Sequence, residues 1–88
     1  MPYFVYYLYS PSIRKFYIGK AQDISYRVEE HNKSLEKYTK RGVPWTLIGY
    51  VECKSNAEAS QLERKFKKAK NPKYVKWYIE LNGIIQTA

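Results

Sequence analysis

The sequence predicts an α/β or α+β domain, in which a small three-stranded sheet is flanked by about three helices. Aromatic and β-branched residues, which favour strands, make three runs over residues 3–10, 15–19 and 45–54. Three other segments carry the caps and apolar spacing that are typical of helices. The 88 residues fit one domain, residues 1–88, because domains typically contain roughly 50 to 250 residues.

The first two strands are expected to form a hairpin. Both faces of residues 3–10 are apolar or amphipathic, which indicates a strand covered on both sides. Pro11 and Ser12 interrupt this run, and residues 15–19 are close enough to return antiparallel to it. Cys53, the only cysteine, falls in the third strand, where we expect a small buried hydrophobe. A lone cysteine excludes an internal disulfide and a cysteine-rich zinc site.

The first helix is expected over residues 24–33, because Asp23 is a natural N-cap. Residues 34–44 are polar and basic and predict a mobile loop. Ile24, Val28 and Leu35 are the residues of this region expected to face the core.

Two further helices follow the third strand. Ser55 and Glu58 have the spacing of a capping box, which opens a helix running to about Lys70. Asn71, followed by proline, caps a last helix that Gly83 ends. Three- and four-residue spacing predicts that these helices bury Ala59, Leu62, Phe66, Ala69, Val75, Tyr78, Ile79 and Leu81.

Basic residues outnumber acidic residues, with sixteen Lys and Arg against eight Asp and Glu, for a net charge of +8. This imbalance favours a polyanionic partner. Nucleic acid comes first, and a membrane surface is a weak second because no basic segment carries a long apolar face. The sequence has neither a signal peptide pattern nor an apolar run of roughly 20 residues. We therefore expect a cytoplasmic protein with no membrane partner.

Several chemically useful side chains occur in a fixed order along the chain. Tyr6 lies in the first strand, and Tyr17 begins the stretch Tyr-Ile-Gly-Lys in the second. Arg27 and His31 are four residues apart and so share one helix face. Glu63 follows in a lysine-rich helix. Two tyrosines, an arginine, a histidine and a carboxylate are the groups needed to cut a phosphodiester with one metal ion.

These motifs resemble the GIY-YIG endonuclease domain of certain homing endonucleases and of the incision half of bacterial excision repair. The chain is most similar to the short stand-alone bacterial members, and the resemblance extends from Tyr3 to about Leu81. Phe4 departs from the pattern, because it stands at the glycine position of the first motif. The resemblance implies a three-stranded antiparallel sheet flanked by helices, endonuclease activity on DNA, and Mg2+ or Mn2+ as the cofactor.

The resemblance makes Glu63 the metal ligand, since these ions keep several waters and often bind one or two carboxylates. The alternative is a surface glutamate that pairs with Lys67 one turn later. Arg27 would stabilise the anionic transition state, for which a planar, permanently charged guanidinium is suited. Its alternative is an ordinary solvated arginine.

His31, the only histidine, has a reference pKa near neutrality and could accept a proton from a tyrosine or from water. By resemblance, Tyr17 is the general base and Tyr6 is its positioning partner. The alternative for both is a place in the core of a tyrosine-rich protein, and spacing alone does not separate their roles.

Nucleic acid is expected to contact glycine and basic residues. Gly19 would let the DNA backbone come close, and Lys20 would hold a phosphate. Further lysines and arginines would track phosphates without reading sequence. These are Lys37, Lys40, Arg41, Lys67, Lys68 and Lys70.

The sequence therefore predicts a metal-dependent endonuclease that hydrolyses DNA and is structure-selective or only weakly sequence-selective, because no second DNA-binding domain accompanies it. Three alternatives stay open. The chain could be a catalytically silent basic module that binds nucleic acid, or a nuclease subunit that needs a partner protein for its target. RNA is also a conceivable substrate, since bases of either polymer stack on tyrosines.

Overall fold

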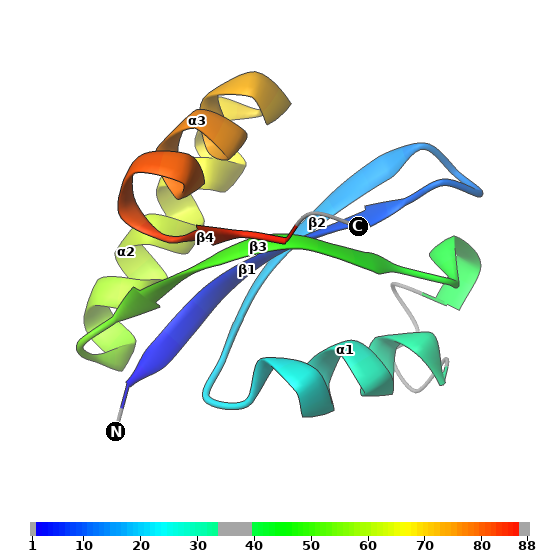
Figure 1. Cartoon of the computed structure of the whole chain (residues 1–88), viewed down its shortest axis with the longest axis horizontal. Helices are drawn as coiled ribbons and strands as arrows, with labels where there is room; N and C mark the ends of the chain where they lie inside the picture. Colours follow the sequence, from blue (N-terminus) through cyan, green and yellow to red (C-terminus); the bar gives the residue numbers. More distant parts are fainter. Residues whose placement is uncertain (1, 34–39, 87–88) are drawn as a thin grey trace.

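The computed structural model of the chain describes residues 2–33 and 40–86 (Figure 1). The strands are β1 (Tyr3–Ser10), β2 (Lys15–Ala21), β3 (Thr46–Cys53) and β4 (Ile84–Ile85). The helices are α1 (Ile24–Asn32), α2 (Asn56–Ala69) and α3 (Pro72–Asn82), with a short 3-10 helix η1 (Lys40–Gly42) before β3. In the part of the chain so described, no helix has the length and apolarity needed to cross a bilayer.

The sheet is antiparallel with strand order β2-β1-β3-β4, so the described strands number four and not the expected three. The added strand is β4, which pairs Ile84 with Tyr50 and Ile85 with Gly49 of β3. Gln86 extends the contact, since its backbone N–H donates to the Ile48 carbonyl at 2.8 Å. A strand of two residues has no alternating pattern, which is why the sequence did not predict it.

Gly83 makes the turn between α3 and β4 possible. Its N–H donates to the Ile79 carbonyl and ends α3, as predicted. The backbone of Gly83 has φ −147°, an extended value that any residue adopts. Glycine is needed here for a different reason, because a Cβ at this position would overlap the carbonyl of Tyr50 in β3.

The predicted caps are confirmed for all three α-helices of the described chain. The Asp23 carboxylate accepts from the Tyr26 N–H at 3.0 Å at the start of α1. The Ser55 hydroxyl accepts from the Glu58 N–H at 3.2 Å at the start of α2. At the start of α3, the side chain of Asn71 accepts from two backbone N–H groups. Such caps satisfy N–H groups that have no partner within the helix.

The sheet separates two clusters of side chains, with α2 and α3 on one face and α1 on the other (Figure 1). Burial of these apolar side chains is the main stabilising contribution. The α2/α3 cluster buries Val5, Tyr7, Val51, Cys53, Ala59, Leu62, Phe66, Val75 and Ile79. The α1 cluster buries Tyr6, Leu8 and Trp45, with Tyr17, Ala21, Ile24, Val28, Val43, Leu47 and Tyr50 packed around them.

Two residues predicted to be buried are not. Ala69 is exposed in the last turn of α2, just before Lys70 ends the helix in the left-handed conformation. Leu81 is 65 % exposed because it lies on the side of α3 that faces away from the sheet. Leu35 lies outside the described residues.

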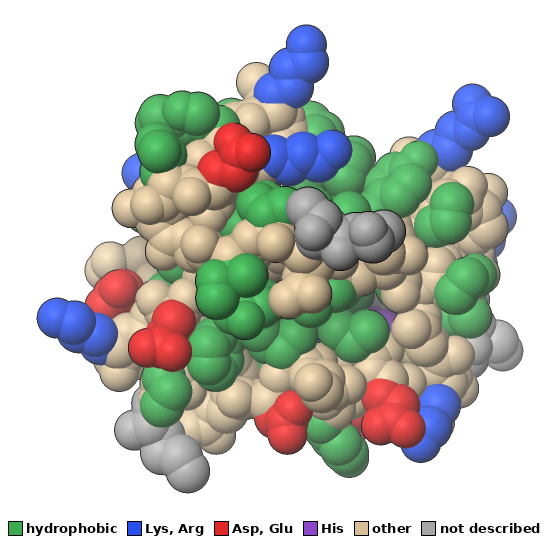
Figure 2. Space-filling view, in the orientation of Figure 1, with side chains coloured by type: hydrophobic (Ala, Val, Ile, Leu, Met, Phe, Trp, Pro, Cys, Tyr) green, Lys and Arg blue, Asp and Glu red, His purple; other side chains and the backbone are tan. Residues whose placement is uncertain are grey.

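The exposed charges are spread out on the face shown in Figure 2. Lysine and arginine side chains project singly there, and acidic side chains lie between them. Among the described residues, no continuous basic patch forms on this face. The net charge of +8 is thus not concentrated on this side of the molecule.

Candidate active site

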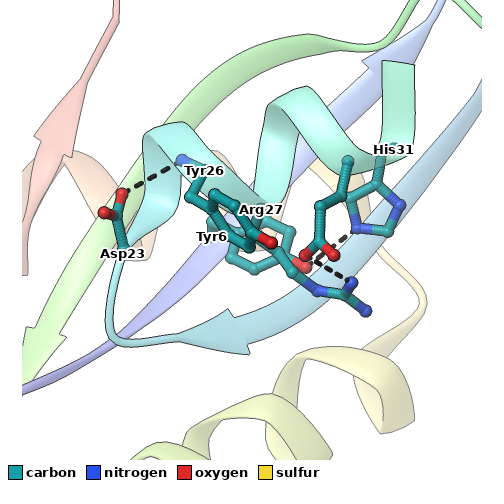
Figure 3. A network of polar contacts seen from close by, with 6 residues as sticks. Tyr6, Asp23, Tyr26, Arg27 and His31 are labelled. Carbon is teal, nitrogen blue, oxygen red and sulfur yellow. Dashed lines mark hydrogen bonds and ion pairs between the residues drawn. The ribbon is translucent and has the colours of Figure 1, made fainter. Parts of the chain in front are cut away.

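The centre of the candidate site is a buried pair, Tyr6 of β1 and His31 of α1. The Tyr6 hydroxyl and His31 Nε2 are 3.0 Å apart, a hydrogen-bond distance. Both side chains are inaccessible to solvent, at 1 % and 0 % exposure. Each polar group therefore satisfies the other inside the α1 cluster, as buried polar groups generally require. Figure 3 shows both side chains meeting on the side of α1 that faces the sheet.

Tyr17 of β2 lies next to this pair. The register pairs Tyr6 with Gly19 and Leu8 with Tyr17, so Tyr17 is the diagonal neighbour of Tyr6 on the same face of the sheet. The ring centroid of Tyr17 is 6.4 Å from that of Tyr6 and 5.0 Å from that of His31, which it meets edge-on. Unlike the other two, Tyr17 is only half-buried.

Gly19 leaves the space that the Tyr6 ring occupies. The two residues are direct partners across β1 and β2, and a Cβ on Gly19 would overlap the hydroxyl end of Tyr6. Gly19 itself is buried. The contact with Tyr6 accounts for a glycine here without any ligand, and the expected approach of nucleic acid to Gly19 stays a prediction.

Arg27 lies one turn before His31 on α1, and Figure 3 shows it on the same side of the helix. Its side chain is 27 % exposed, and its Nη1 donates to Glu30 Oε1 at 3.1 Å. Glu30 is also part-exposed, so this ion pair contributes little to stability. The pair instead holds the guanidinium beside Tyr6 and His31, where an anionic group could reach it.

Glu63 comes to the site from the opposite face of the sheet. Asn56, Ser60, Glu63 and Lys67 are three or four residues apart and share one face of α2. This face is turned toward β2, because Lys20 of β2 donates from its Nζ to Asn56 Oδ1 at 2.7 Å and to Ser60 Oγ at 2.5 Å. Further along, a shallow hollow between β2 and α2 is lined by Phe16, Tyr17, Ile18 and Lys67.

Glu63 therefore lies alongside β2, between the two contacts that α2 makes with this strand. Since β2 is an edge strand of the sheet, Glu63 and Tyr17 approach its open edge from opposite sides. The Glu63 side chain is 20 % exposed, and its Oε2 is 3.8 Å from Lys67 Nζ. The predicted pairing with Lys67 is thus present, at a distance too long for a hydrogen bond.

The chemistry of Glu63 fits one Mg2+ or Mn2+ ion. A part-exposed carboxylate offers oxygen ligands and leaves the remaining coordination positions to water and phosphate, the arrangement these ions commonly take. No group of three or more His, Cys, Asp and Glu gathers in residues 2–33 and 40–86. Within that part of the chain, Glu63 is the carboxylate on the α2 side of β2, whereas Glu30, on the α1 side, is paired with Arg27.

The other predicted nucleic-acid contacts are dispersed. Lys67, Lys68 and Lys70 are exposed at the end of α2, and Arg41 is exposed in η1. Lys37 lies outside the described residues, as does the side chain of Lys40.

Sequence analysis did not find a role for Asn32. Its side-chain amide accepts from the Trp45 N–H at 2.6 Å and donates to the Trp45 carbonyl at 3.1 Å. This pair of bonds fastens the start of β3 to the end of α1, and the Trp45 ring lies 6.1 Å from Tyr17. The thirteen-residue separation of Asn32 and Trp45 has no signature in the sequence pattern.

The class of domain to which the chain belongs is shown by its match to a family of nuclease domains. The model of the GIY-YIG catalytic domain matches residues 2–75, so the chain belongs to the GIY-YIG family, a family of DNA endonucleases. Among curated proteins, no sequence matches significantly.

The fold is similar to that of a solved structure, the UPF0213 protein BH0048 from Bacillus halodurans, determined in solution by NMR. The two share 25% sequence identity with a TM-score of 0.55, and the match covers 94% of this chain and 87% of the other. That protein is of the short stand-alone type.

Proposed function

We propose that this protein is a metal-dependent endonuclease that hydrolyses phosphodiester bonds in DNA. The observation that carries the proposal is the position of Tyr17, which is half-exposed above a buried, hydrogen-bonded Tyr6–His31 pair. Arg27 stands beside the pair, and Glu63 lies across the edge of β2. A purely structural cluster needs neither the half-buried tyrosine nor the part-exposed cation and carboxylate.

In the proposed reaction a water oxygen bonds to phosphorus as the bond to the leaving oxygen breaks. Tyr17, which is less buried than Tyr6 and His31, orients this water and accepts its proton. The Tyr6–His31 pair fixes the Tyr17 ring from below and takes up the proton in turn, because imidazole binds a proton near neutral pH. The leaving oxygen receives a proton from solvent.

The remaining groups act on the phosphate. Arg27 donates from its planar guanidinium to the non-bridging oxygens, where negative charge grows in the transition state. Glu63 would hold Mg2+ or Mn2+ and thereby supply a positive charge that polarises the phosphate. Glu63 and Arg27 reach the edge of β2 from opposite faces of the sheet, so we expect the scissile phosphate to lie at that edge.

We further propose that cutting is structure-selective or only weakly sequence-selective. The exposed lysines that flank α2 are contacts for phosphates, which carry no sequence information. Affinity that rests on such contacts falls steeply with salt.

The test is cleavage of labelled DNA substrates: a duplex, a flap, a fork, a four-way junction and a single strand. Each is incubated with Mg2+, Mn2+ or EDTA and with native protein, Glu63→Ala or Glu58→Ala. Glu58 is an exposed glutamate in the first turn of the same helix and is a matched control. We expect metal-dependent cutting that Glu63→Ala abolishes and Glu58→Ala retains.

A second candidate, a nuclease subunit that a protein partner completes, is favoured by the outer surface of α3. Trp77 and Leu81 lie one turn apart there and are 53 % and 65 % exposed. Exposed apolar side chains that cluster in this way often mark an interaction site. Intact DNA binding without cleavage of any substrate would select this candidate over a self-sufficient enzyme.

A further inference from the structure

A second hollow lies beside Tyr17, at the end of the sheet where the β1–β2 hairpin turns. Its volume is about 400 Å³, within the range of small-molecule sites. Figure 1 shows the hairpin end next to η1, at the opposite end of the sheet from the β3–α2 connection. The hollow is lined by Ile13, Lys15, Phe16, Tyr17, Arg41 and Trp45.

The floor of this hollow is held rigidly. Trp45 is only 6 % exposed, and its backbone is fastened by both polar atoms of the Asn32 amide. Gly42 packs against its indole so closely that a Cβ there would overlap the ring. The Tyr17 ring stands 6.1 Å from the indole at an angle of 60°. These contacts fix two aromatic rings before any ligand arrives, which reduces the entropy lost on binding.

The rim of the hollow is cationic. Lys15 and Arg41 are exposed and line it, and Ile13 adds an apolar side chain from the hairpin turn. Aromatic walls that open between two cations are complementary to a flat aromatic group that carries a phosphate. A nucleotide has this composition, since its base stacks on rings and its phosphate pairs with cations.

We propose that the hollow binds the base of an unpaired nucleotide next to the bond that is cut. This inference rests on the proposed function, because Tyr17 is both a wall of the hollow and the residue placed at the reacting water. A strand whose phosphate lies at the edge of β2 would pass its neighbouring nucleotide over Tyr17 into the hollow.

The hollow accounts for a preference for flaps, forks and gaps. In an intact duplex both faces of every base are covered by neighbours, so a base enters a pocket only after unstacking and unpairing. That step costs a few kcal/mol in a duplex and much less for a base that is already unpaired. An unpaired base therefore gains the stacking interaction without the full opening cost, and such DNA binds more tightly.

The first experiment places 2-aminopurine, a fluorescent base that stacking quenches, at successive positions near a flap junction. Binding of native protein is measured in EDTA, so that the DNA stays intact. We expect quenching at one unpaired position next to the junction, and no such quenching when the same base is paired in a duplex. Equal responses for paired and unpaired bases would overturn the proposal.

The second experiment fills the hollow. Ile13→Trp puts a bulky ring into it, and Ile84→Trp makes the same change at an exposed isoleucine of β4, away from the hairpin. Ile13→Trp should weaken binding of flap DNA by about five-fold or more, the lower end of base–aromatic stacking, and leave duplex binding unchanged. Equal flap affinities for the two variants, measured by fluorescence anisotropy, would contradict the assignment.

The third experiment tests the cationic rim with a substitution at an exposed residue, which leaves the packing of the core unchanged. Lys15→Ala should reduce the slope of log affinity against log salt by about 1 for flap DNA, as loss of one phosphate contact does. Lys54→Ala, an exposed lysine at the opposite end of the sheet, should leave the slope as it is. A slope that Lys15→Ala leaves unchanged would also overturn the proposal.

These outcomes separate the hollow from the proposed function. Quenching that Ile13→Trp removes, in a protein that cuts no DNA, supports the hollow and contradicts a self-sufficient nuclease. Metal-dependent cutting that depends on Glu63 but proceeds equally on duplex and flap supports the nuclease and contradicts the hollow.

Discussion

Tyr6 and Tyr7 are adjacent in the sequence and lie in different chemical environments, because successive residues of a strand point to opposite faces of the sheet. Tyr7 faces α2 and α3, where it stacks on Phe16 with ring centroids 4.8 Å apart. Burial raises the pKa of Tyr7 to about 12. Tyr6 faces α1, where its hydroxyl meets the imidazole of His31.

The comparison shows that β1 places the same side-chain type in two different environments. On the α2/α3 face a tyrosine hydroxyl is kept neutral in apolar surroundings. On the α1 face the same group is paired with a base and stands beside a cation. Both tyrosines are almost inaccessible, at 1 % and 2 % exposure, so burial alone does not distinguish Tyr7 from Tyr6, the residue proposed to take part in catalysis.

The largest effect is expected from removing the two hydroxyls one at a time. Tyr6→Phe should lower the cleavage rate by about 10³-fold, within the range of general acid–base catalysis, because the ring stays and the bond to His31 is lost. Tyr7→Phe should leave the rate within about two-fold, since that hydroxyl is remote from the phosphate. Single-turnover cleavage of flap DNA measures both, and equal losses would refute the division between the faces.

The next largest effect concerns Arg27. Arg27→Ala should slow cleavage by about 10²-fold, as loss of one transition-state donor does, with little change in DNA affinity. Its control is Glu30→Gln, which removes the ion-pair partner and keeps the guanidinium, and which should retain most of the activity. If both variants lose activity equally, Arg27 acts only by pairing with Glu30.

Lys20 tests how α2 is attached to β2. Its ammonium donates to two side chains of α2, so Lys20→Met should lower the free energy of unfolding by about 1–3 kcal/mol. Chemical denaturation measures this loss. The salt dependence of DNA binding should stay unchanged if Lys20 is committed to α2, whereas a slope reduced by about 1 would assign it to phosphate.

The last prediction concerns the stability contributed by Tyr7, which should change only at alkaline pH. Because burial raises its folded-state pKa from 10.0 to about 12, the folded protein keeps the hydroxyl proton after the unfolded chain has lost it. The resulting stability is complete below pH 10 and is lost as the pH rises through 12, a change of up to about 3 kcal/mol.

Tyr7→Phe should remove this alkaline loss. Tyr26→Phe, at a tyrosine that is 61 % exposed, should leave it in place. The free energy of unfolding of both variants is measured by denaturation at a series of pH values between 8 and 12. An identical decline of this free energy in the two variants would show that a group other than Tyr7 is responsible.

Much of the fold was predictable from local signals. Three side chains that can cap a helix predict where the helices begin, and each makes the expected hydrogen bond: Asp23, Ser55 and Asn71. The strands follow from aromatic and β-branched runs. The fourth strand was missed because Ile84 and Ile85 pair with β3 only through the close approach of Gly83, which is a tertiary contact.

Less of the candidate site could be predicted from local sequence signals. Arg27 and His31 share a helix face by spacing, but nothing local indicates that His31 meets Tyr6, twenty-five residues away. Spacing alone does not distinguish Glu63 from a surface glutamate that pairs with Lys67, so only the family motif indicates that Glu63 belongs to the site. The hollow beside Tyr17 depends on the hairpin, η1 and β3 together, which no sequence window contains.

The fit between Gly19 and Tyr6 also constrains how this protein could evolve. Tyr6 of the first motif occupies the space that a side chain on Gly19 of the second motif would need, so neither position varies freely while the other stays the same. A substitution at either site alone should be purged, whereas a paired exchange that shortens residue 6 and enlarges residue 19 should restore the fold without the chemistry. We therefore expect changes at residues 6 and 19 to be coupled, because a larger side chain at residue 19 fits only beside a smaller one at residue 6.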